Sequence, residues 1–412
     1  MNKKLSLLFS PQNRLQTFTI LIMALYNIQS WIPRFKTVVD SSMALLTLYA
    51  FYCIAKHFNR EKGLVVSAYR VVLLFMVLNI AYYIYARYNH HNSFIIAILG
   101  GRRIKDTLVC LIPFFIAYEI GDKSVLNPVF FLICMVPAYM LSFWGVETLQ
   151  TDIFGVRVQN NIIYGILALF PYFILVKHII GKILGFLLIS FMVIYAAKRG
   201  AVLAIPGIII LFFLDLIINA KKTFSHYLIV MVTLTAIIWL SFHNVADFVQ
   251  NDDLIQRRVK ATLNEKSSRH YDYYYNLWRT ADLEEQAIGL GYIATAQYSP
   301  DGEYAHNDLL EVLVDFGLVG VAVFAVLYLS LYMLCTNRFL LKDERLMLFS
   351  CLWIFFIKGL TAGGFFGDSW LLFFGFGYYV GKIHSRSLEK EQEIIAPETP
   401  PALPQQEIPA NT

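Results

Sequence analysis

The sequence of 412 residues is poor in charged side chains. Only 15% of its residues are Asp, Glu, Lys or Arg, whereas soluble domains contain about 25%. Hydrophobic residues make up 58% of the chain. This balance excludes an ordinary soluble domain and indicates a membrane protein with many spans. The net charge of +5 is explained by a basic inner surface, so it gives no reason to expect a nucleic-acid partner.

Cysteine is scarce, and the long polar region before residue 308 contains none. A disulfide in that region is therefore excluded, and no Cys/His cluster has the spacing of a zinc site. All five cysteines fall in apolar segments: Cys53, Cys110, Cys134, Cys335 and Cys351.

Several catalytic signatures are also absent from the sequence. It contains no Walker A loop, no GxGxxG, no paired-histidine metal motif and no GxSxG elbow. These absences argue against nucleotide hydrolysis and dinucleotide binding. An enzyme with this sequence needs a donor substrate that is already activated.

Long apolar runs are the dominant feature that is present. A transmembrane helix needs about 20 apolar residues, and the runs predict an all-α integral membrane protein with about twelve spans. The fourth run is interrupted by "ILGGRRIKD", which is compatible with one tilted helix or with a short re-entrant piece followed by a short span. The predicted spans are 15–33, 38–57, 64–86, 95–120, 127–145, 161–177, 182–198, 200–219, 227–243, 308–335, 346–361 and 369–384.

An even number of spans places both termini on the same side of the membrane. Basic residues near the ends indicate that this side is the cytoplasm: Lys3, Lys4, Arg14, Lys382, Arg386 and Lys390. We therefore expect four parts: a membrane domain with helices 1–9 (1–243), a periplasmic loop (244–307), a membrane domain with helices 10–12 (308–386) and a disordered, Pro-rich cytoplasmic tail (387–412).

The loop between the ninth and tenth spans is unusually long. Loops longer than about 15 residues are uncommon and are usually functional or disordered. This one contains the patch "RHYDYYYNLWRTADLEEQ", which favours helices, and it has too many aromatic residues for a disordered segment. We expect it to be structured and to form the head of an active or binding site.

The segment "YAHNDLLEVLVDFGLVG" (304–320) joins this loop to the tenth span. Asp308 and Glu311 have the spacing of a helix capping box. Asp308, Glu311 and Asp315 recur at helical spacing and therefore share one face. His306 precedes the helix, whose positive end favours a neutral imidazole that can accept a proton. The alternative interpretation is a helix cap beside a solvated histidine.

Basic residues lie in several segments that this topology places outside, against the positive-inside preference. Charge at membrane depth is costly and usually marks a function or a pairing. Because the arginine fork binds phosphate bidentately, these residues predict a phosphate-like anion site. The strongest candidates are Arg199 and Arg269, followed by Arg102 and Lys105 beside the interrupted fourth run.

Four segments together resemble the O-antigen ligase and polymerase family of bacterial envelope glycosyltransferases. They are "YAAKRGAVLAIPGIIILFF", "SSRHYDYYYNLW", "GLGYI" and "HNDLLEVLVDFGLVGV", of which the last is the most specific. The segment "GGFFGDSW", with Asp368, is a weaker match. The resemblance covers roughly residues 150–370.

The resemblance implies an activity at the periplasmic face of the bacterial inner membrane. Such enzymes take a glycan from undecaprenyl pyrophosphate among the membrane lipids, without a metal or other cofactor. Ligases transfer it to lipid A–core, polymerases to another lipid-linked glycan, and a related branch to protein hydroxyls. By this resemblance His306 is the catalytic base, and Arg199 and Arg269 bind the pyrophosphate. Arg102 and Lys105 are further candidates for the same anion, and the supporting residues are Asn307, Glu311 and Asp368.

A flippase or transporter for a polar lipid is the alternative from another class. Transporters tend to have related halves with interrupted helices in corresponding positions. This chain has one interrupted run and no evident similarity between its halves, which favours the enzyme. The twelve-span layout and the large loop favour a ligase over a polymerase, whereas no motif specifies the sugar, the linkage or the acceptor.

Overall fold

The computed structural model describes residues 13–29, 36–58, 65–89, 96–154, 161–196, 198–219, 232, 266–299, 305–362 and 369–395. Within these ranges every regular element is a helix, which confirms the all-α prediction. The elements are α2 (Arg14–Ile28), α3 (Lys36–His57), α4 (Val65–Asn89), the π-helical turn η2 (Ile96–Gly100), α5 (Gly101–Lys123), α6 (Pro128–Phe154), α7 (Ile163–Leu167), α8 (Phe170–Ile174), α9 (Ile179–Ala196), α10 (Arg199–Asn219), α13 (Lys266–Arg279), α14 (Leu283–Ile288), α15 (Ala294–Tyr298), α16 (Asp308–Cys335), α17 (Lys342–Thr361) and α18 (Trp370–Ile395).

Six helices among the described residues are long and apolar enough to cross a membrane: α3, α4, α6, α9, α10 and α16. The chain is therefore a multi-pass membrane protein, while the total of about twelve spans stays a prediction. The ninth predicted span, 227–243, lies almost wholly outside the described residues, since only Val232 is described there.

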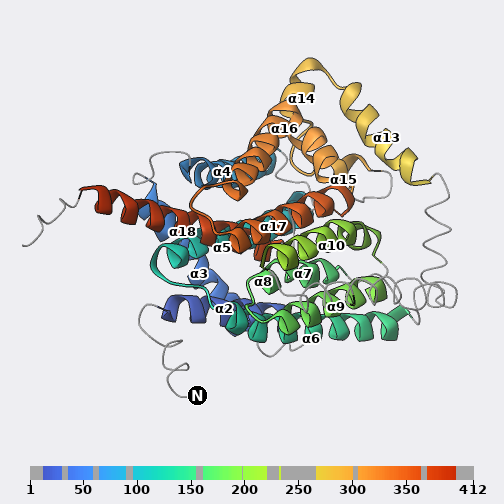
Figure 1. Cartoon of the computed structure of the whole chain (residues 1–412). Helices are drawn as coiled ribbons and strands as arrows, with labels where there is room; N and C mark the ends of the chain where they lie inside the picture. Colours follow the sequence, from blue (N-terminus) through green and yellow to red (C-terminus); the bar gives the residue numbers. More distant parts are fainter. Residues whose placement is uncertain are drawn as a thin grey trace, which may run out of the picture.

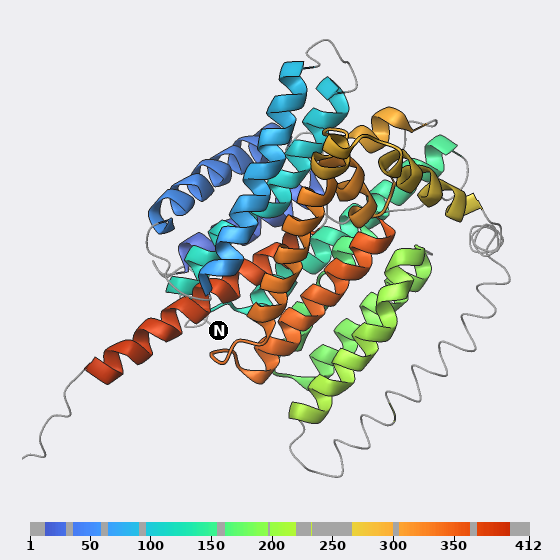
Figure 2. The ribbon, with the colours of Figure 1, turned by 90° about the horizontal axis from the view of Figure 1, so that it is seen from above.

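The long helices pack side by side into a bundle (Figure 1). Viewed from above, α4, α16, α17 and α10 run next to one another (Figure 2). The short helices α13, α14 and α15 lie at one end of this bundle, and the C-terminal part of α18 extends from the opposite end. The large loop therefore covers the end at which α16 begins.

Helices α5 and α18 approach each other very closely. A Cβ atom on Gly377 would lie 2.0 Å from the carbonyl oxygen of Phe114, and one on Gly381 would lie 2.0 Å from that of Tyr118. The four-residue spacing of these glycines places them on one face of α18, as in the small-xxx-small pattern of membrane helices. This contact fixes α5 inside the bundle.

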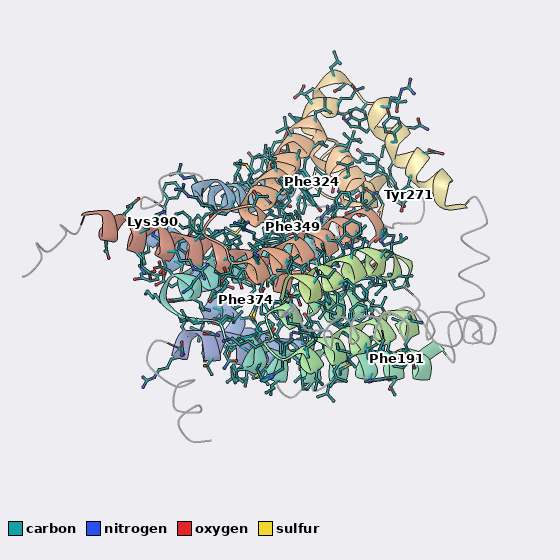
Figure 3. The ribbon with its side chains drawn as sticks, in the orientation of Figure 1. Phe191, Tyr271, Phe324, Phe349, Phe374 and Lys390 are labelled. Atoms are coloured by element: carbon teal, nitrogen blue, oxygen red, sulfur yellow. The ribbon has the colours of Figure 1, made fainter. Side chains whose placement is uncertain are left out.

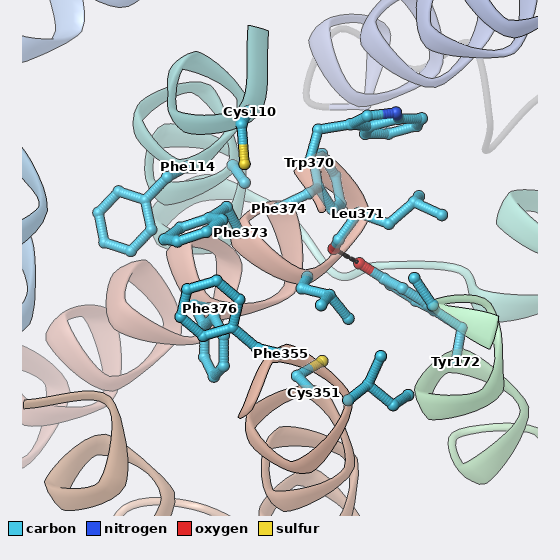
Figure 4. Close-up of a cluster of buried hydrophobic side chains, with 14 of the residues drawn as sticks. Cys110, Phe114, Tyr172, Cys351, Phe355, Trp370, Leu371, Phe373, Phe374 and Phe376 are labelled. Carbon is cyan, nitrogen blue, oxygen red and sulfur yellow. Dashed lines mark hydrogen bonds between the residues drawn. The ribbon is translucent and has the colours of Figure 1, made fainter. Parts of the chain in front are cut away.

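Aromatic side chains fill the space around this contact (Figure 4). The ring centroids of Phe355 on α17 and Phe373 on α18 are 5.2 Å apart. The buried hydroxyl of Tyr172 donates a hydrogen bond of 2.6 Å to the carbonyl of Leu371. This bond satisfies a polar group for which lipid would offer no partner.

The outer surface of the bundle is apolar as well. In Figure 3 the labelled Phe374 lies within the bundle, whereas Phe191 lies at its edge, and 60% of its surface is exposed. Large apolar side chains with such exposure suit a lipid environment, where water does not contact them.

Two predicted boundaries differ from the structure, and one open alternative is decided by it. The single helix predicted at 161–177 is divided into α7 and α8, because Pro171 has no backbone N–H to continue the helical ladder. For the interrupted fourth run, the structure agrees with the alternative of one helix rather than a short re-entrant piece, since η2 leads directly into α5. The tail predicted as disordered from residue 387 begins as helix, and α18 continues to Ile395, because "SLEKEQ" consists largely of good helix formers.

Candidate functional site

Helix α16 is broken near its first third, at Gly317. This residue has φ 63° and ψ −160°, a conformation available mainly to glycine. A Cβ atom on Gly317 would also lie 2.5 Å from the backbone carbonyl of Ala287. The break therefore requires glycine both for its backbone conformation and for the close approach of the loop.

The "GLGYI" segment is hydrogen-bonded to this break. The amide of Leu290 donates to the carbonyl of Val314 at 2.8 Å, and the amide of Gly291 donates to that of Asp315 at 3.3 Å. These bonds satisfy carbonyl groups next to the kink. The loop is thus attached to the start of α16 through its backbone.

Arg103 binds the same region from the other side. Its Nη1 lies 2.5 Å from Oδ2 of Asp315, and its Nη2 lies 3.3 Å from Oε2 of Glu311. Its guanidinium carbon is 5.6 Å from the ring centroid of Tyr292, within the range of a cation–π contact. Arg103 is only 4% exposed, and Asp315 also accepts a hydrogen bond of 3.0 Å from the amide of Thr295. One buried network therefore joins α5, α16 and the loop.

His306 is held by the same network through its backbone. Its amide donates a hydrogen bond of 3.0 Å to Oε1 of Glu311, whose other carboxylate oxygen faces Arg103. The backbone of His306 is left-handed, with φ 54°, and the residue is exposed. Glu311 thus fixes the backbone of a histidine whose side chain can meet a ligand at the end of the bundle.

The predicted capping box is wrong by one residue. The N-cap is Asn307, whose side-chain oxygen accepts a hydrogen bond of 3.1 Å from the amide of Leu310. Asp308 is the first helical residue, and Glu311 bonds to the amide of His306. The shift occurs because Asn307 has the extended backbone that an N-cap requires. Its side-chain nitrogen also donates to the carbonyl of Leu360 at 3.2 Å.

The N-terminal ends of α10 and α16 lie at the same end of the bundle, next to the C-terminal end of α17. Asn307 bonds to Leu360 of α17. A Cβ atom on Gly200 of α10 would lie 2.1 Å from the hydroxyl of Thr361. Arg199 is the first residue of α10, so its backbone belongs to this end, close in sequence to that contact.

The other predicted basic residues have different locations. The side chains of Arg199 and Arg269 lie outside the described part of the structure, as does Asp368, so their convergence on one anion stays a prediction. Arg269 belongs to α13, which packs against α16. Arg102 and Lys105 are exposed on α5, whereas Arg103 between them is the arginine that enters the buried network.

Sequence reasoning overlooked Lys358, a buried cation at the same end. Its Nζ donates a hydrogen bond of 2.8 Å to Oγ of Ser369 and lies 5.7 Å from the ring centroid of Tyr164. Lys358 is 4% exposed. Its position inside the predicted span 346–361 was the available signal, because charge at membrane depth is costly.

The described residues contain no group of three or more His, Cys, Asp or Glu side chains arranged to hold a metal ion. Metal independence stays an expectation from the family resemblance.

Two apolar grooves lead along the bundle toward this end. The larger has a volume of about 730 Å³ and lies between α10, α16 and α17. The smaller, of about 200 Å³, is lined by Phe324 and Gly359 and ends at Asp308. Tyr328 and Phe356 line both grooves, which are therefore neighbours. Together they follow α16 to the residues that adjoin His306.

Part of the chain matches a known family model. Residues 184–325 match the family model described as O-Antigen ligase. The matched segment includes α10, α13–α15 and the first part of α16, and therefore includes Arg199, Arg269 and His306. No curated protein matches the chain.

Proposed function

We propose that this chain transfers a glycan from undecaprenyl pyrophosphate to an acceptor hydroxyl. The premise is that it belongs to the O-antigen ligase and polymerase family of membrane glycosyltransferases. The reaction takes place at the end of the bundle covered by α13–α15, at the periplasmic face of the inner membrane. The observation that carries this proposal is the position of His306, an exposed histidine whose backbone is fixed by the buried Glu311–Arg103 network.

In this mechanism His306 is the general base. A ring nitrogen accepts the proton of the acceptor hydroxyl as that oxygen attacks the anomeric carbon of the donor sugar. The new glycosidic bond forms while the bond from the anomeric carbon to the pyrophosphate oxygen breaks. Undecaprenyl pyrophosphate leaves with the bonding electron pair, and the guanidinium groups of Arg199 and Arg269 stabilise its charge.

The apolar grooves support a lipid-linked donor. The described residues that line the larger groove are apolar and aromatic, with no charged side chain among them, as a polyprenyl chain requires. A chain lying along the two grooves would have its polar end near the start of α16. This arrangement brings the reactive pyrophosphate to the level of His306.

The acceptor we favour is lipid A–core, which makes the protein an O-antigen ligase. We favour it because of the twelve-span layout expected from the sequence and the size of the loop between the ninth and tenth spans. A polymerase, which takes a second lipid-linked glycan as acceptor, is the alternative within the family.

The test is transfer by the purified protein from a defined undecaprenyl-pyrophosphate glycan, with a chelator present. We expect His306→Ala to lower turnover by about 10²–10⁴-fold, the usual contribution of a general base. His178→Ala, which removes an exposed histidine between α8 and α9, serves as the matched control and should retain activity. Near wild-type turnover by His306→Ala would remove this histidine from the mechanism.

Two further arms refine the same assay. Product formed only with lipid A–core identifies a ligase, and product formed only with a second lipid-linked glycan identifies a polymerase. Arg199→Lys and Arg269→Lys retain the charge but lose the planar fork, so turnover should fall in both. Full activity in both variants would show that these arginines contribute only a general positive potential. Loss of wild-type activity in chelator would indicate a required metal.

A further inference from the structure

A separate cavity of about 570 Å³ lies between the C-terminal end of α4 and the helices α14 and α15 of the loop. Its volume is within the range of about 300–1,000 Å³ that is typical of ligand pockets. Tyr292, whose ring contacts Arg103, also lines this cavity. The cavity therefore adjoins the buried network that fixes His306, while the apolar grooves have a different lining.

The lining combines aromatic rings with hydrogen-bonding side chains. Three tyrosines contribute: Tyr82 and Tyr85 from α4, and Tyr292. Four polar side chains accompany them and form no hydrogen bond or ion pair with the described residues, so they are available to a ligand: Asn89, Glu284, Glu285 and Gln297.

The charge of the lining excludes a phosphate ligand. Glu284, Glu285 and Asp282 are acidic, and no lysine or arginine is among the described residues that line the cavity. Asp282 caps α14 by accepting a hydrogen bond of 2.8 Å from the amide of Glu285. These carboxylates also do not belong to a metal-holding group among the described residues. The described lining therefore offers a matching set of partners to neither an anion nor a metal ion.

A sugar residue meets all of these requirements. Its hydroxyl groups donate to carboxylates and exchange hydrogen bonds with amide side chains. The apolar face of a pyranose ring packs against an aromatic ring, which offers a large apolar surface. The position also suits a glycan, because the cavity adjoins the C-terminal part of the candidate span in α4.

We propose that this cavity is a carbohydrate-binding subsite that holds sugar residues of a glycan beside the transfer site. The inference rests on the proposed function only in naming the source of that glycan, which is either the donor or the acceptor. Binding itself depends only on the lining residues.

The experiment measures binding by saturation-transfer NMR on the full-length protein in detergent. One probe is the glycan released by mild acid from the host's own undecaprenyl pyrophosphate. The other is the deacylated core oligosaccharide of the same host. The test variants are Tyr85→Ala and the double variant Glu284→Gln/Glu285→Gln. Tyr88→Ala, on the same helix but outside the cavity and 82% exposed, and Asp272→Asn on α13 are the matched controls.

We expect the test variants to bind one of the two glycans about tenfold more weakly than the wild type, as the loss of one aromatic or hydrogen-bonding contact implies. The controls should bind as the wild type does. The glycan whose binding weakens is the source. Inorganic pyrophosphate should not displace it, since the described residues that line the cavity include no lysine or arginine.

Three results would overturn the subsite: no binding of either glycan by the wild type, equal binding by test and control variants, or displacement by pyrophosphate. None of these depends on His306. If His306→Ala retained full transfer while the cavity variants lost glycan binding, the proposed mechanism would fail and the subsite would stand.

Discussion

The guanidinium of Arg103 lies 2.5 Å from the carboxylate of Asp315, which is 212 positions later in the chain. Both side chains are buried. Because the same guanidinium also faces Glu311, and Glu311 accepts a hydrogen bond from the backbone of His306, the position of the proposed base depends on a residue of α5. We therefore expect Arg103 to position the proposed base through Glu311.

Loss of Arg103 should be costly for this reason. Arg103→Ala leaves two buried carboxylates without their cation, and breaking a buried pair costs about 3–5 kcal/mol. We expect a clearly lower midpoint of thermal unfolding in detergent. Arg102→Ala removes an exposed neighbour and should change stability by about 0.5 kcal/mol or less. Equal midpoints for the two variants would contradict the buried network.

Arg103→Lys separates positioning from folding. It keeps a positive charge but cannot bridge Glu311 and Asp315 with one planar group. We expect a folded protein with lower kcat and nearly unchanged KM for the donor. An unchanged kcat in a variant that folds would show that Arg103 has no influence on His306.

Gly317→Ala tests the break in α16. The new Cβ would meet the carbonyl of Ala287 at 2.5 Å in a backbone with φ 63°, so strain of about 1–3 kcal/mol is expected. The unfolding midpoint should fall, and hydrogen exchange at the amides of Leu290 and Gly291 should accelerate. Gly101→Ala, where the nearest atom is the Tyr83 hydroxyl at 3.6 Å, should be neutral. Unaltered exchange in Gly317→Ala would argue against the attachment of the loop.

Gly377→Ala tests the contact between α5 and α18. Its Cβ would meet a backbone carbonyl, that of Phe114, which cannot move without shifting α5. We expect a marked loss of folded protein in membranes, measured by the yield of monodisperse protein. At Gly375 the nearest atom is the end of the flexible Met347 side chain, at 2.8 Å, so Gly375→Ala should be tolerated better. Similar yields for both variants would contradict the close packing of the two helices.

Ser299→Cys tests the topology. An impermeant thiol reagent should label this residue at the end of α15 from the periplasmic side, if the loop faces outward as the basic ends predict. The background should be low, because four of the five free cysteines are buried and Cys134 is half-buried. Labelling only after the inner membrane is broken would place the loop on the other side and exclude the proposed reaction there.

The class of protein and the local elements of the site follow from the amino-acid sequence alone. Long apolar runs require helices, because lipid offers no partner for backbone hydrogen bonds. The spacing of Asp308, Glu311 and Asp315 predicted one face, and all three are buried. The aromatic patch in the loop predicted helices, and the structure has α13 and α14 there. Each of these properties follows from the period of a helix and the polarity of its residues.

Which groups meet depends on how the helices pack in three dimensions. Among Arg102, Arg103 and Lys105, helix rotation and the close contact of α5 with α18 turn Arg103 inward. The start of α16 next to the break at Gly317 is hydrogen-bonded to the "GLGYI" segment of the loop. The position of that segment in the sequence does not reveal this contact. Lys358 meets Ser369 because α17 and α18 pack together. Contacts between distant residues depend on the packing of whole helices, and a local pattern does not contain that information.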